Sequence, residues 1–344
     1  MFIIGSVLLQ LFALIYMAGV REAIIHTGKT VFLGTAPVDP RDPFRGDYVS
    51  LKYEISEIPL RKFRGTLPAD KSAKYYTVLK KGESDLFDLD YCTTVRPAGD
   101  AVFIKGRNEY RFNPASQKYL PLKYGIEKYF VQQKKGLDIE KRAGRGNDVH
   151  VPLEVEVALG SDGTAVAKDY RWGQLGVGLE ITERSQPGRN NWNNGQEQPP
   201  PENKDVKVRK SPKLKITLQN ASGKPLAIVN LPDSRSFNAV SASLEKEWTF
   251  AKTFSEPVKP RNEDVIVLKP DEKVSFDFDF AEPRWFVNGK KGPDEIGVLC
   301  NEWSDMFRII YAPPSREECS TLEKKGLIWH GKLMSRRFNA GRVD

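Results

Sequence analysis

The sequence predicts a mainly β protein that begins with one apolar helix and continues into two β-rich domains. Three observations support this fold class. The first 20 residues carry no charged side chain, and most of the remaining chain consists of short alternating runs broken by Pro and Gly residues. A polar stretch divides these runs into two groups. Because alternation with a period of two indicates strands, and 344 residues exceed one ordinary core, we expect two β domains.

Residues 2–20 form an uncharged stretch of 19 residues that is long enough to cross a lipid bilayer. A helix of this length extends about 28 Å, close to the thickness of the hydrocarbon core. No basic segment precedes the stretch, and no small-residue cleavage pattern follows it, which favours an uncleaved single-pass transmembrane anchor over a cleaved signal peptide. We therefore assign residues 1–20 as the anchor and expect the lipid bilayer as a partner through residues 2–20.

Charge and cysteine content bear on which side of the membrane the soluble domains occupy. Arg21 and Lys29 follow the span, which favours a cytoplasmic position, although an adjacent glutamate weakens that signal. Cys300 and Cys319 could pair in an oxidising compartment and leave Cys92 free, and this pairing stays open. We expect the domains on the extracytoplasmic side, in the cell envelope.

The first domain, residues 21–184, is predicted to consist mostly of strands. Residues 49–56 alternate apolar and polar side chains, which is typical of a strand with one buried face. Residues 151–159 repeat this pattern, and Ser161-Asp162-Gly163 then supplies a turn. We therefore expect a hairpin that continues from Ala165 onward.

One short helix is predicted within the first domain. Ile126, Tyr129 and Phe130 are spaced i, i+3 and i+4, and Gln132 to Lys135 follow them. We expect this helix to lie on the sheet.

Residues 185–205 have the composition of a linker. They contain no aliphatic residue, five Asn and three consecutive prolines. Such a stretch cannot bury a core and favours extended, partly polyproline conformations. We place the domain boundary there.

The second domain, residues 206–342, is predicted to be a β-sandwich of the immunoglobulin-like kind. Short alternating runs recur with Pro and Gly turns between them and with almost no helical pattern. The candidate strands are residues 214–218, 225–229, 264–268, 274–280, 307–311 and 331–335.

Several function classes are disfavoured by the composition and by missing motifs. The three His and three Cys residues are not at metal-ligand spacings, so we expect no metal site. No phosphate-binding loop, dinucleotide fingerprint or nucleophile elbow occurs, so we assign no cofactor and no catalytic residue. The net charge of +8 is spread evenly, with +4 on each side of Thr182. We therefore expect no nucleic-acid partner.

The most distinctive segment is residues 37–55, which read PVDPRDPFRGDYVSLKYEI. Its three prolines fix φ and favour extended neighbours, so residues 38–44 should form a stiff crossing. Five charges follow closely in this crossing: Asp39, Arg41, Asp42, Arg45 and Asp47. The favoured interpretation is a set of local ion pairs and turn-capping carboxylates that hold the loop.

Two functional interpretations of the same crossing stay open. Arg41 and Arg45 could clamp a carboxylate or phosphate in the bidentate manner of guanidinium groups. Asp39 and Asp42 could instead bind a hard cation or share acid–base work.

Gly46-Asp47-Tyr48, Leu51 and Tyr53 match the pattern after which the GDYXXLXY family is named. The chain resembles that family over about residues 1–180, including the membrane span, the Pro-x-Asp-Pro-Arg loop and a later segment from Tyr124 to Val131. The resemblance implies a membrane-associated protein and brings no assigned activity.

Together these features favour a non-catalytic, membrane-anchored envelope protein that acts as a binding or adaptor module, with another membrane or envelope protein as its partner. The alternative is a membrane-bound hydrolase or transferase that uses the Asp/Arg-rich loop 39–47. The candidate binding surface consists of Asp39, Arg41, Asp42, Arg45, Asp47, Tyr48 and Glu127.

Overall fold

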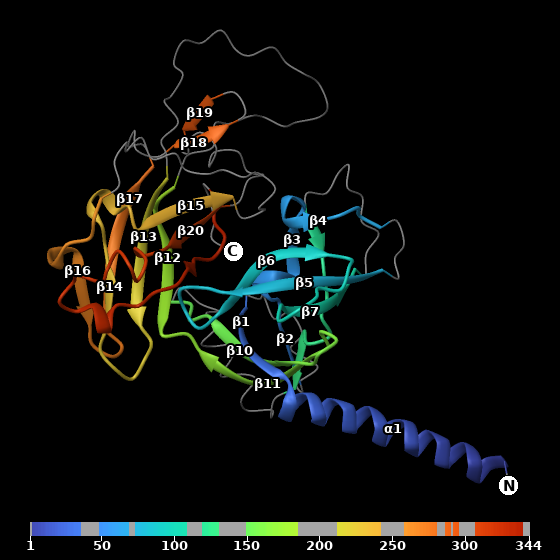
Figure 1. The fold of residues 1–344 in the computed structure, drawn as a ribbon. Helices are drawn as coiled ribbons and strands as arrows, with labels where there is room; N and C mark the ends of the chain where they lie inside the picture. The colour runs from blue at the N-terminus through green and yellow to red at the C-terminus, as the bar shows by residue number, and fades with distance from the viewer. Residues whose placement is uncertain are drawn as a thin grey trace. The chain divides into compact units, whose positions relative to one another are not determined.

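The computed structural model describes residues 2–35, 48–68, 73–108, 119–130, 149–184, 212–241, 258–280, 286–289, 292–295 and 307–339. These residues form one α-helix, short 3₁₀ helices and many strands (Figure 1), which confirms the mainly β class. The chain divides into two compact units. Unit 1 comprises Met1–Gly146 with Val151–Gly173, and unit 2 comprises Asn147–His150 with Gln174–Asp344.

Unit 1 contains two main sheets and two strand pairs around one core. The first sheet has the order β1 (Lys29–Gly34), β10 (Leu153–Leu159) and β11 (Ala165–Trp172). The second has the order β4 (Phe63–Arg64), β6 (Phe87–Thr93), β5 (Lys74–Lys81) and β7 (Val102–Arg107). The pairs are β2 (Tyr48–Ser50) with β9 (Lys128–Phe130), and β3 (Glu57–Pro59) with β8 (Tyr119–Pro121). Two 3₁₀ helices, η1 (Glu54–Ser56) and η2 (Leu60–Lys62), complete the unit.

The core of unit 1 follows the predicted alternation. Val155 and Val157 on β10 are fully buried, and they pack with Leu33 of β1 and Ile104 of β7. The hairpin expected after residue 159 is present, because β10 pairs with β11 in antiparallel register. Burial of one strand face against the second sheet supplies the hydrophobic driving force for this unit.

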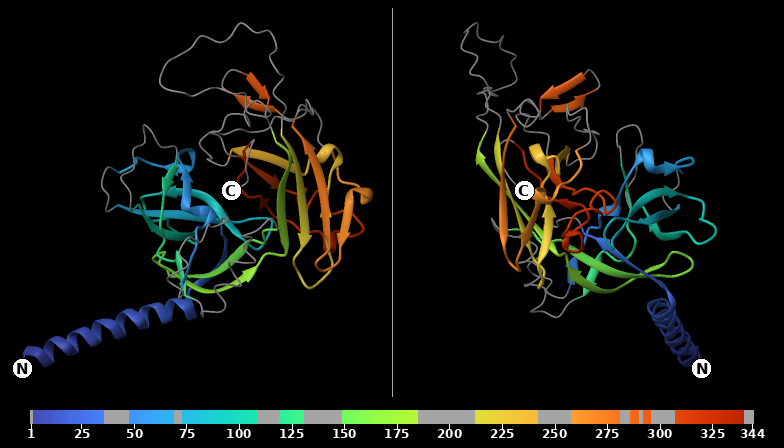
Figure 2. Two further views of the ribbon diagram at one scale, coloured as in Figure 1. Left: turned by 180° about the vertical axis from the view of Figure 1, so that it is seen from behind. Right: turned by 60° about the vertical axis from the view of Figure 1, so that its left-hand side comes forward.

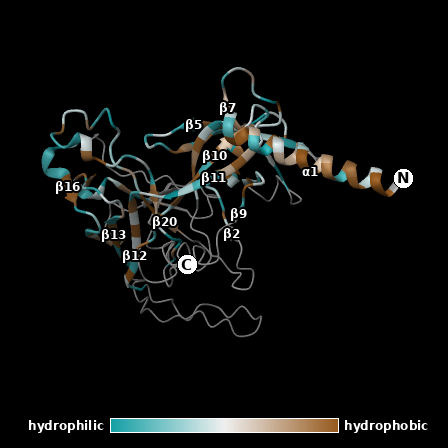
Figure 3. Ribbon diagram, turned by 90° about the horizontal axis from the view of Figure 1, so that it is seen from below, coloured by the Kyte–Doolittle hydropathy of each residue, from teal (hydrophilic) through white to brown (hydrophobic). Residues whose placement is uncertain are grey.

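Helix α1 (Phe2–Thr27) has an exposed apolar body and a half-buried end. Within Ile3–Thr27, the most apolar window of 18 residues has a mean hydropathy of 2.2, and none of that window is buried. Figure 3 shows hydrophobic residues along most of the helix, and Figure 2 shows it projecting from the strands of its own unit. The helix is therefore long and apolar enough to cross a membrane.

The end of α1 is joined closely to the first sheet. Ile24 is half-buried, and the Gly28 amide donates to the Ile24 carbonyl oxygen at 2.8 Å. A Cβ at position 28 would lie 2.9 Å from the Leu159 carbonyl oxygen. Because only glycine lacks that atom, Gly28 allows the helix to end directly against β10.

The described part of the GDYXXLXY pattern is built into the core through the segment 124–130. The Leu51 amide donates to the Glu127 carbonyl oxygen at 2.7 Å, and the Tyr53 hydroxyl donates to the Ile126 carbonyl oxygen at 2.9 Å. Tyr48 pairs with Phe130 in the β2–β9 ladder. Leu51 and Tyr53 are buried, so both side chains of the pattern have structural roles.

Two local predictions differ from the structure. The helix expected from Ile126 is wrong over the described residues, because Lys128–Phe130 forms β9 and pairs with β2, while residues 131–135 lie outside them. The strand expected over residues 49–56 ends early, since β2 stops at Ser50 and η1 begins at Glu54. In both places, pairing between segments distant in sequence overrides a local pattern.

Unit 2 packs two three-stranded sheets around an aromatic-rich core. One sheet has the order β12 (Leu175–Glu183), β13 (Lys213–Asn220) and β17 (Lys273–Asp279). The other has the order β15 (Phe237–Ser241), β20 (Phe307–Tyr311) and β21 (Leu333–Met334). The Phe237 ring lies 5.1 Å from the rings of Phe276 and Phe278, which joins the two sheets across the core. The immunoglobulin-like topology stays a prediction.

The remaining elements of unit 2 are short. They are the pair β14 (Leu226–Val229) and β16 (Val265–Leu268), the pair β18 (Phe286–Gly289) and β19 (Gly292–Glu295), and η3 (Pro232–Ser234), η4 (Asn262–Asp264) and η5 (Lys325–Leu327). All four residues of β14 are buried, because Leu226 and Ile228 face the main core while Ala227 and Val229 face a second cluster with Cys319.

The division between the units falls earlier than the linker identified in the sequence. The units separate at Gly173, whereas the sequence places the boundary in residues 185–205, which lie outside the described residues. Strand β12 pairs with β13 from Leu175↔Asn220 to Glu183↔Lys213. The strand before the polar stretch thus belongs to unit 2, because its apolar face enters the unit 2 core.

We expect Tyr53→Phe to lower the free energy of unfolding by about 1 kcal/mol, because the buried Ile126 carbonyl would lose its donor. Chemical denaturation of the full chain measures this change. Tyr76→Phe is the matched control, since the Tyr76 hydroxyl makes no hydrogen bond within the described part of the chain. Equal stability changes in the two variants would contradict the structural role of Tyr53.

Candidate functional site

The structure describes only part of the binding surface suggested by the sequence. Five of its residues lie outside the described ranges: Asp39, Arg41, Asp42, Arg45 and Asp47. Tyr48 is described through its backbone, which begins β2. Glu127 is fully described and lies in the turn that precedes β9.

The Glu127 carboxylate holds this turn together. Oε1 accepts a hydrogen bond from the Tyr124 amide at 2.6 Å, and Oε2 accepts one from the Gly125 amide at 3.0 Å. Gly125 has a positive φ of 81°, which suits glycine at this position. Both carboxylate oxygens therefore have a turn-stabilising role.

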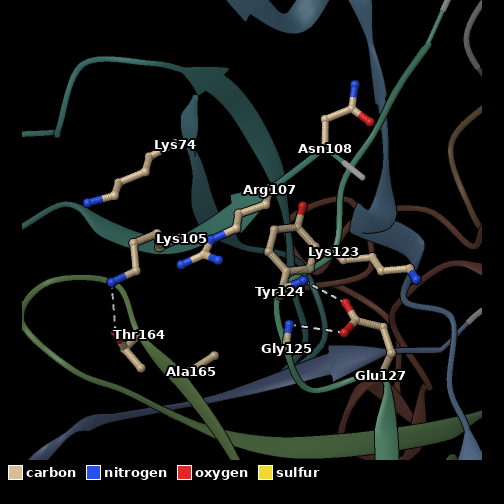
Figure 4. Close-up of a pocket in the computed structure, with 10 residues that line it drawn as sticks. All are labelled: Lys74, Lys105, Arg107, Asn108, Lys123, Tyr124, Gly125, Glu127, Thr164 and Ala165. Atoms are coloured by element: carbon tan, nitrogen blue, oxygen red, sulfur yellow. Dashed lines mark hydrogen bonds between the residues drawn. The ribbon is translucent and has the colours of Figure 1, made fainter. Parts of the chain in front are cut away.

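A pocket of about 680 Å³ opens beside this turn (Figure 4). It is formed by the start of β5, the end of β7, the turn before β9 and the start of β11. Its lining residues are Lys74, Lys105, Arg107, Asn108, Lys123, Tyr124, Gly125, Glu127, Thr164 and Ala165. Four of these ten residues are basic and one is acidic, so the pocket favours anions.

Three of the cations are aligned by strand pairing. Lys74 of β5 lies directly opposite Arg107 of β7. On the other side of Arg107, its amide donates to the Lys123 carbonyl oxygen at 2.8 Å, and the Lys123 amide donates back at 2.9 Å. Like charges directly opposite each other destabilise a sheet, so the fold maintains a positive row here at some cost.

The cations differ in how they are neutralised within the protein. Figure 4 shows Lys74, Lys105 and Arg107 extending toward one side of the pocket and Lys123 toward the other. The Lys105 ammonium contacts Asp162 at 2.5 Å and the Thr164 hydroxyl at 2.9 Å. Within the described residues, the side-chain ends of Lys74 and Arg107 have no such acidic partner.

Lys105 and Asp162 form a salt bridge between β7 and the turn before β11. Burial raises the pKa of Asp162, but hydrogen bonds from Lys105 and Thr164, together with the Lys105 charge, outweigh burial and lower the pKa to about 2. Asp162 is therefore ionised at neutral pH and offsets Lys105. Lys74 and Arg107 remain as the main source of positive potential on that side of the pocket.

The described residues offer few groups for metal or nucleophilic chemistry. No cluster of three or more His, Cys, Asp or Glu residues occurs in the described ranges. Cys92 and Cys319 are buried free thiols, and burial raises the pKa of Cys92 to about 12. Cys92 is therefore a protonated core residue at neutral pH. Cys300 lies outside the described residues, so its relation to Cys319 stays a prediction.

Of the pocket residues, Glu127 was among the sequence candidates, whereas the four basic residues were not. Lys105 and Arg107 occupy alternate positions of one strand, which was the available local signal for a shared basic face. Lys74 and Lys123 join them only through the pairings of β7 with its two neighbours. Such pairings between distant segments cannot be derived from local spacing.

The fold and the pocket together define a mainly β domain with a basic pocket, preceded by an apolar helix. Residues 10–169 match the family model described as GDYXXLXY protein. This part of the chain therefore belongs to the GDYXXLXY family, as the resemblance over residues 1–180 indicated. No curated protein and no solved structure matches the chain.

We expect Lys74→Gln to raise the free energy of unfolding by roughly 0.5 kcal/mol at low salt, because it removes repulsion across β5 and β7. Lys80→Gln is the matched control, since Lys80 lies on the same strand but opposite Asp88. Denaturation at low and high salt measures both variants. The gain should shrink at high salt through screening, and a salt-independent effect would contradict repulsion as its cause.

Proposed function

We propose that the protein is a non-catalytic binding module that is held at a membrane by helix α1. The observation that carries this proposal is the contrast within α1. Leu9 is 70% exposed and Phe12 is 67% exposed, whereas Ile24 is half-buried near β10. Exposing apolar side chains over this length to water costs free energy, whereas placing them in a bilayer is favourable. The exposed helix therefore supports a membrane anchor.

The half-buried end of the helix supports an anchor that positions the domain. Lys29 pairs with Leu159, so β1 begins one residue after the helix-ending glycine at position 28. A short connection of this kind transmits the orientation of α1 to unit 1. A long flexible leader would not be expected to end within the packing of the sheet.

The pocket chemistry favours binding over catalysis. Its acidic residue, Glu127, has both oxygens engaged by main-chain amides. No Cys or His is among the described residues that line the pocket. Several exposed cations with a structurally engaged carboxylate are suited to holding an anionic group. The alternative, a hydrolase or transferase that uses loop 39–47, stays a prediction because that loop lies outside the described residues.

In this proposal, unit 2 supplies a second binding body for another membrane or envelope protein. It has its own core, which includes Phe237, Phe278 and Tyr311. A unit with an independent core can present strands and loops to a partner without altering the anchored unit.

We expect the full chain to stay in the membrane fraction after alkaline extraction, with residues 1–20 still present by intact mass. Leu11→Arg should shift it toward the soluble fraction, since a central arginine raises the insertion free energy by about 3 kcal/mol. Leu327→Arg makes the same change at an exposed position of unit 2 and should have no such effect. A soluble chain that retains residues 1–20 would overturn the anchor, as would a membrane-free product that lacks them.

We expect the soluble units to lie outside the cytoplasm, and Val95→Cys tests this in a Cys300→Ser background. Val95 is 73% exposed, whereas the native Cys92 and Cys319 are buried and should react only after denaturation. A membrane-impermeant maleimide should label position 95 in intact cells. Labelling only after the cells are lysed would place the domains in the cytoplasm.

A further inference from the structure

We propose that the pocket of unit 1 binds a phosphate group, with Lys74 and Arg107 as its principal contacts. This inference deepens the proposed function by naming the ligand class of the binding module. It relies on the membrane anchor only for one possible source of the phosphate, a lipid headgroup. The other source is a soluble phosphate compound.

The first argument is positive charge that has no acidic partner within the described part of the chain. Lys74 and Arg107 are cross-strand partners, so the backbone register holds two cations side by side. Among the described residues, the carboxylate that lines the pocket is engaged, since Glu127 accepts from two amides, and Asp162 pairs with Lys105. An anion that bridges the two cations would convert their repulsion into attraction.

The second argument is donor geometry. The Arg107 guanidinium presents a planar fork of donors, and the Lys74 ammonium presents a compact charge, a combination that suits the oxygens of phosphate. Both residues are exposed, so a ligand can reach them from solvent. Because strands position them, little ordering of the backbone is required when the ligand binds.

The third argument is the size of the pocket. Its volume of about 680 Å³ falls within the range of about 300–1,000 Å³ that is usual for small-molecule sites. A bare phosphate ion would fill only a fraction of it. Lys105 and Thr164 line the pocket and are both held by Asp162, so they form a polar part of the wall that can contact the rest of a phosphate-bearing molecule.

The position of the pocket makes a lipid headgroup one natural source. The turn between β10 and β11 leads directly into Thr164 and Ala165, which line the pocket. At the start of this turn, a Cβ on Gly160 would lie 3.2 Å from the Ile24 side chain of α1. The same turn therefore contacts the helix end and leads into the pocket, and residues at the end of a spanning helix lie at headgroup level.

The test uses the full chain in neutral detergent micelles, titrated with inorganic phosphate and with glycerol 3-phosphate at constant ionic strength. Both should raise the unfolding temperature in a saturable manner, as expected for ligands of the folded state. In K74Q/R107Q the affinity should fall by about tenfold for each cation removed. K80Q/K81Q removes two charges from the same strand outside the pocket lining and should bind like the wild type.

Two outcomes would overturn the proposal: no saturable response in the wild type, or an equal response in K74Q/R107Q. R107K provides a second variant that keeps the charge but loses the guanidinium fork, and it should bind with intermediate affinity. The denaturation curve of each variant shows whether it is folded. Because the titration is done in micelles, it can succeed even if the membrane-retention experiment fails, and the reverse also holds.

A second arm identifies the source of the phosphate. The same chains are placed in nanodiscs of phosphatidylcholine, with or without phosphatidic acid. Phosphatidic acid should stabilise the wild type but not K74Q/R107Q, and inorganic phosphate should reduce this stabilisation by competition. That result would identify a lipid headgroup as the source of the phosphate. Stabilisation by glycerol 3-phosphate alone, with no effect of phosphatidic acid, would identify a soluble phosphate compound. A response to neither would overturn the phosphate site.

Discussion

The contact between the Leu51–Tyr53 segment and residues 124–130 is the constraint on which unit 1 depends. It combines a main-chain hydrogen bond from Leu51, a buried side-chain hydrogen bond from Tyr53 and the short β2–β9 ladder. Through it, segments more than 70 residues apart share one core. The contact also fixes the turn that Glu127 closes, and that turn forms one side of the basic pocket. The family pattern thus contributes to the site indirectly, by holding its frame.

Local neutralisation decides which charges of the pocket are available. Lys105, Arg107 and Lys74 belong to neighbouring strands, yet among the described residues only Lys105 is held by an aspartate, Asp162 of the turn before β11. The pocket is lined by four basic residues and one acidic residue. Counting these charges alone overstates the positive potential of the pocket, because the salt bridge with Asp162 neutralises Lys105. The position of each carboxylate therefore matters more than the net charge of +8 spread over the whole chain.

The end of helix α1 is packed directly against the first sheet. Gly28 removes the one side-chain atom that would separate the helix end from β10, and Ile24 fills space beside the next turn. The apolar body of the helix lacks partners within its own unit, whereas its last turn has them. This asymmetry distinguishes a helix that is long and apolar enough to cross a membrane from a core helix, which would be buried along its length.

Local properties of the sequence determined the apolar helix, the alternating faces of residues 151–159 and membership of residues 10–169 in the GDYXXLXY family. These features depend on composition and on periodicity over a few residues, which can be predicted without knowing any partner strand. Tertiary structure decided that Lys128–Phe130 is a strand, that β12 belongs to unit 2, and that Lys74 lies opposite Arg107. Each of these depends on strand pairing between distant segments, because a hydrogen-bonded register is specified only when both strands meet.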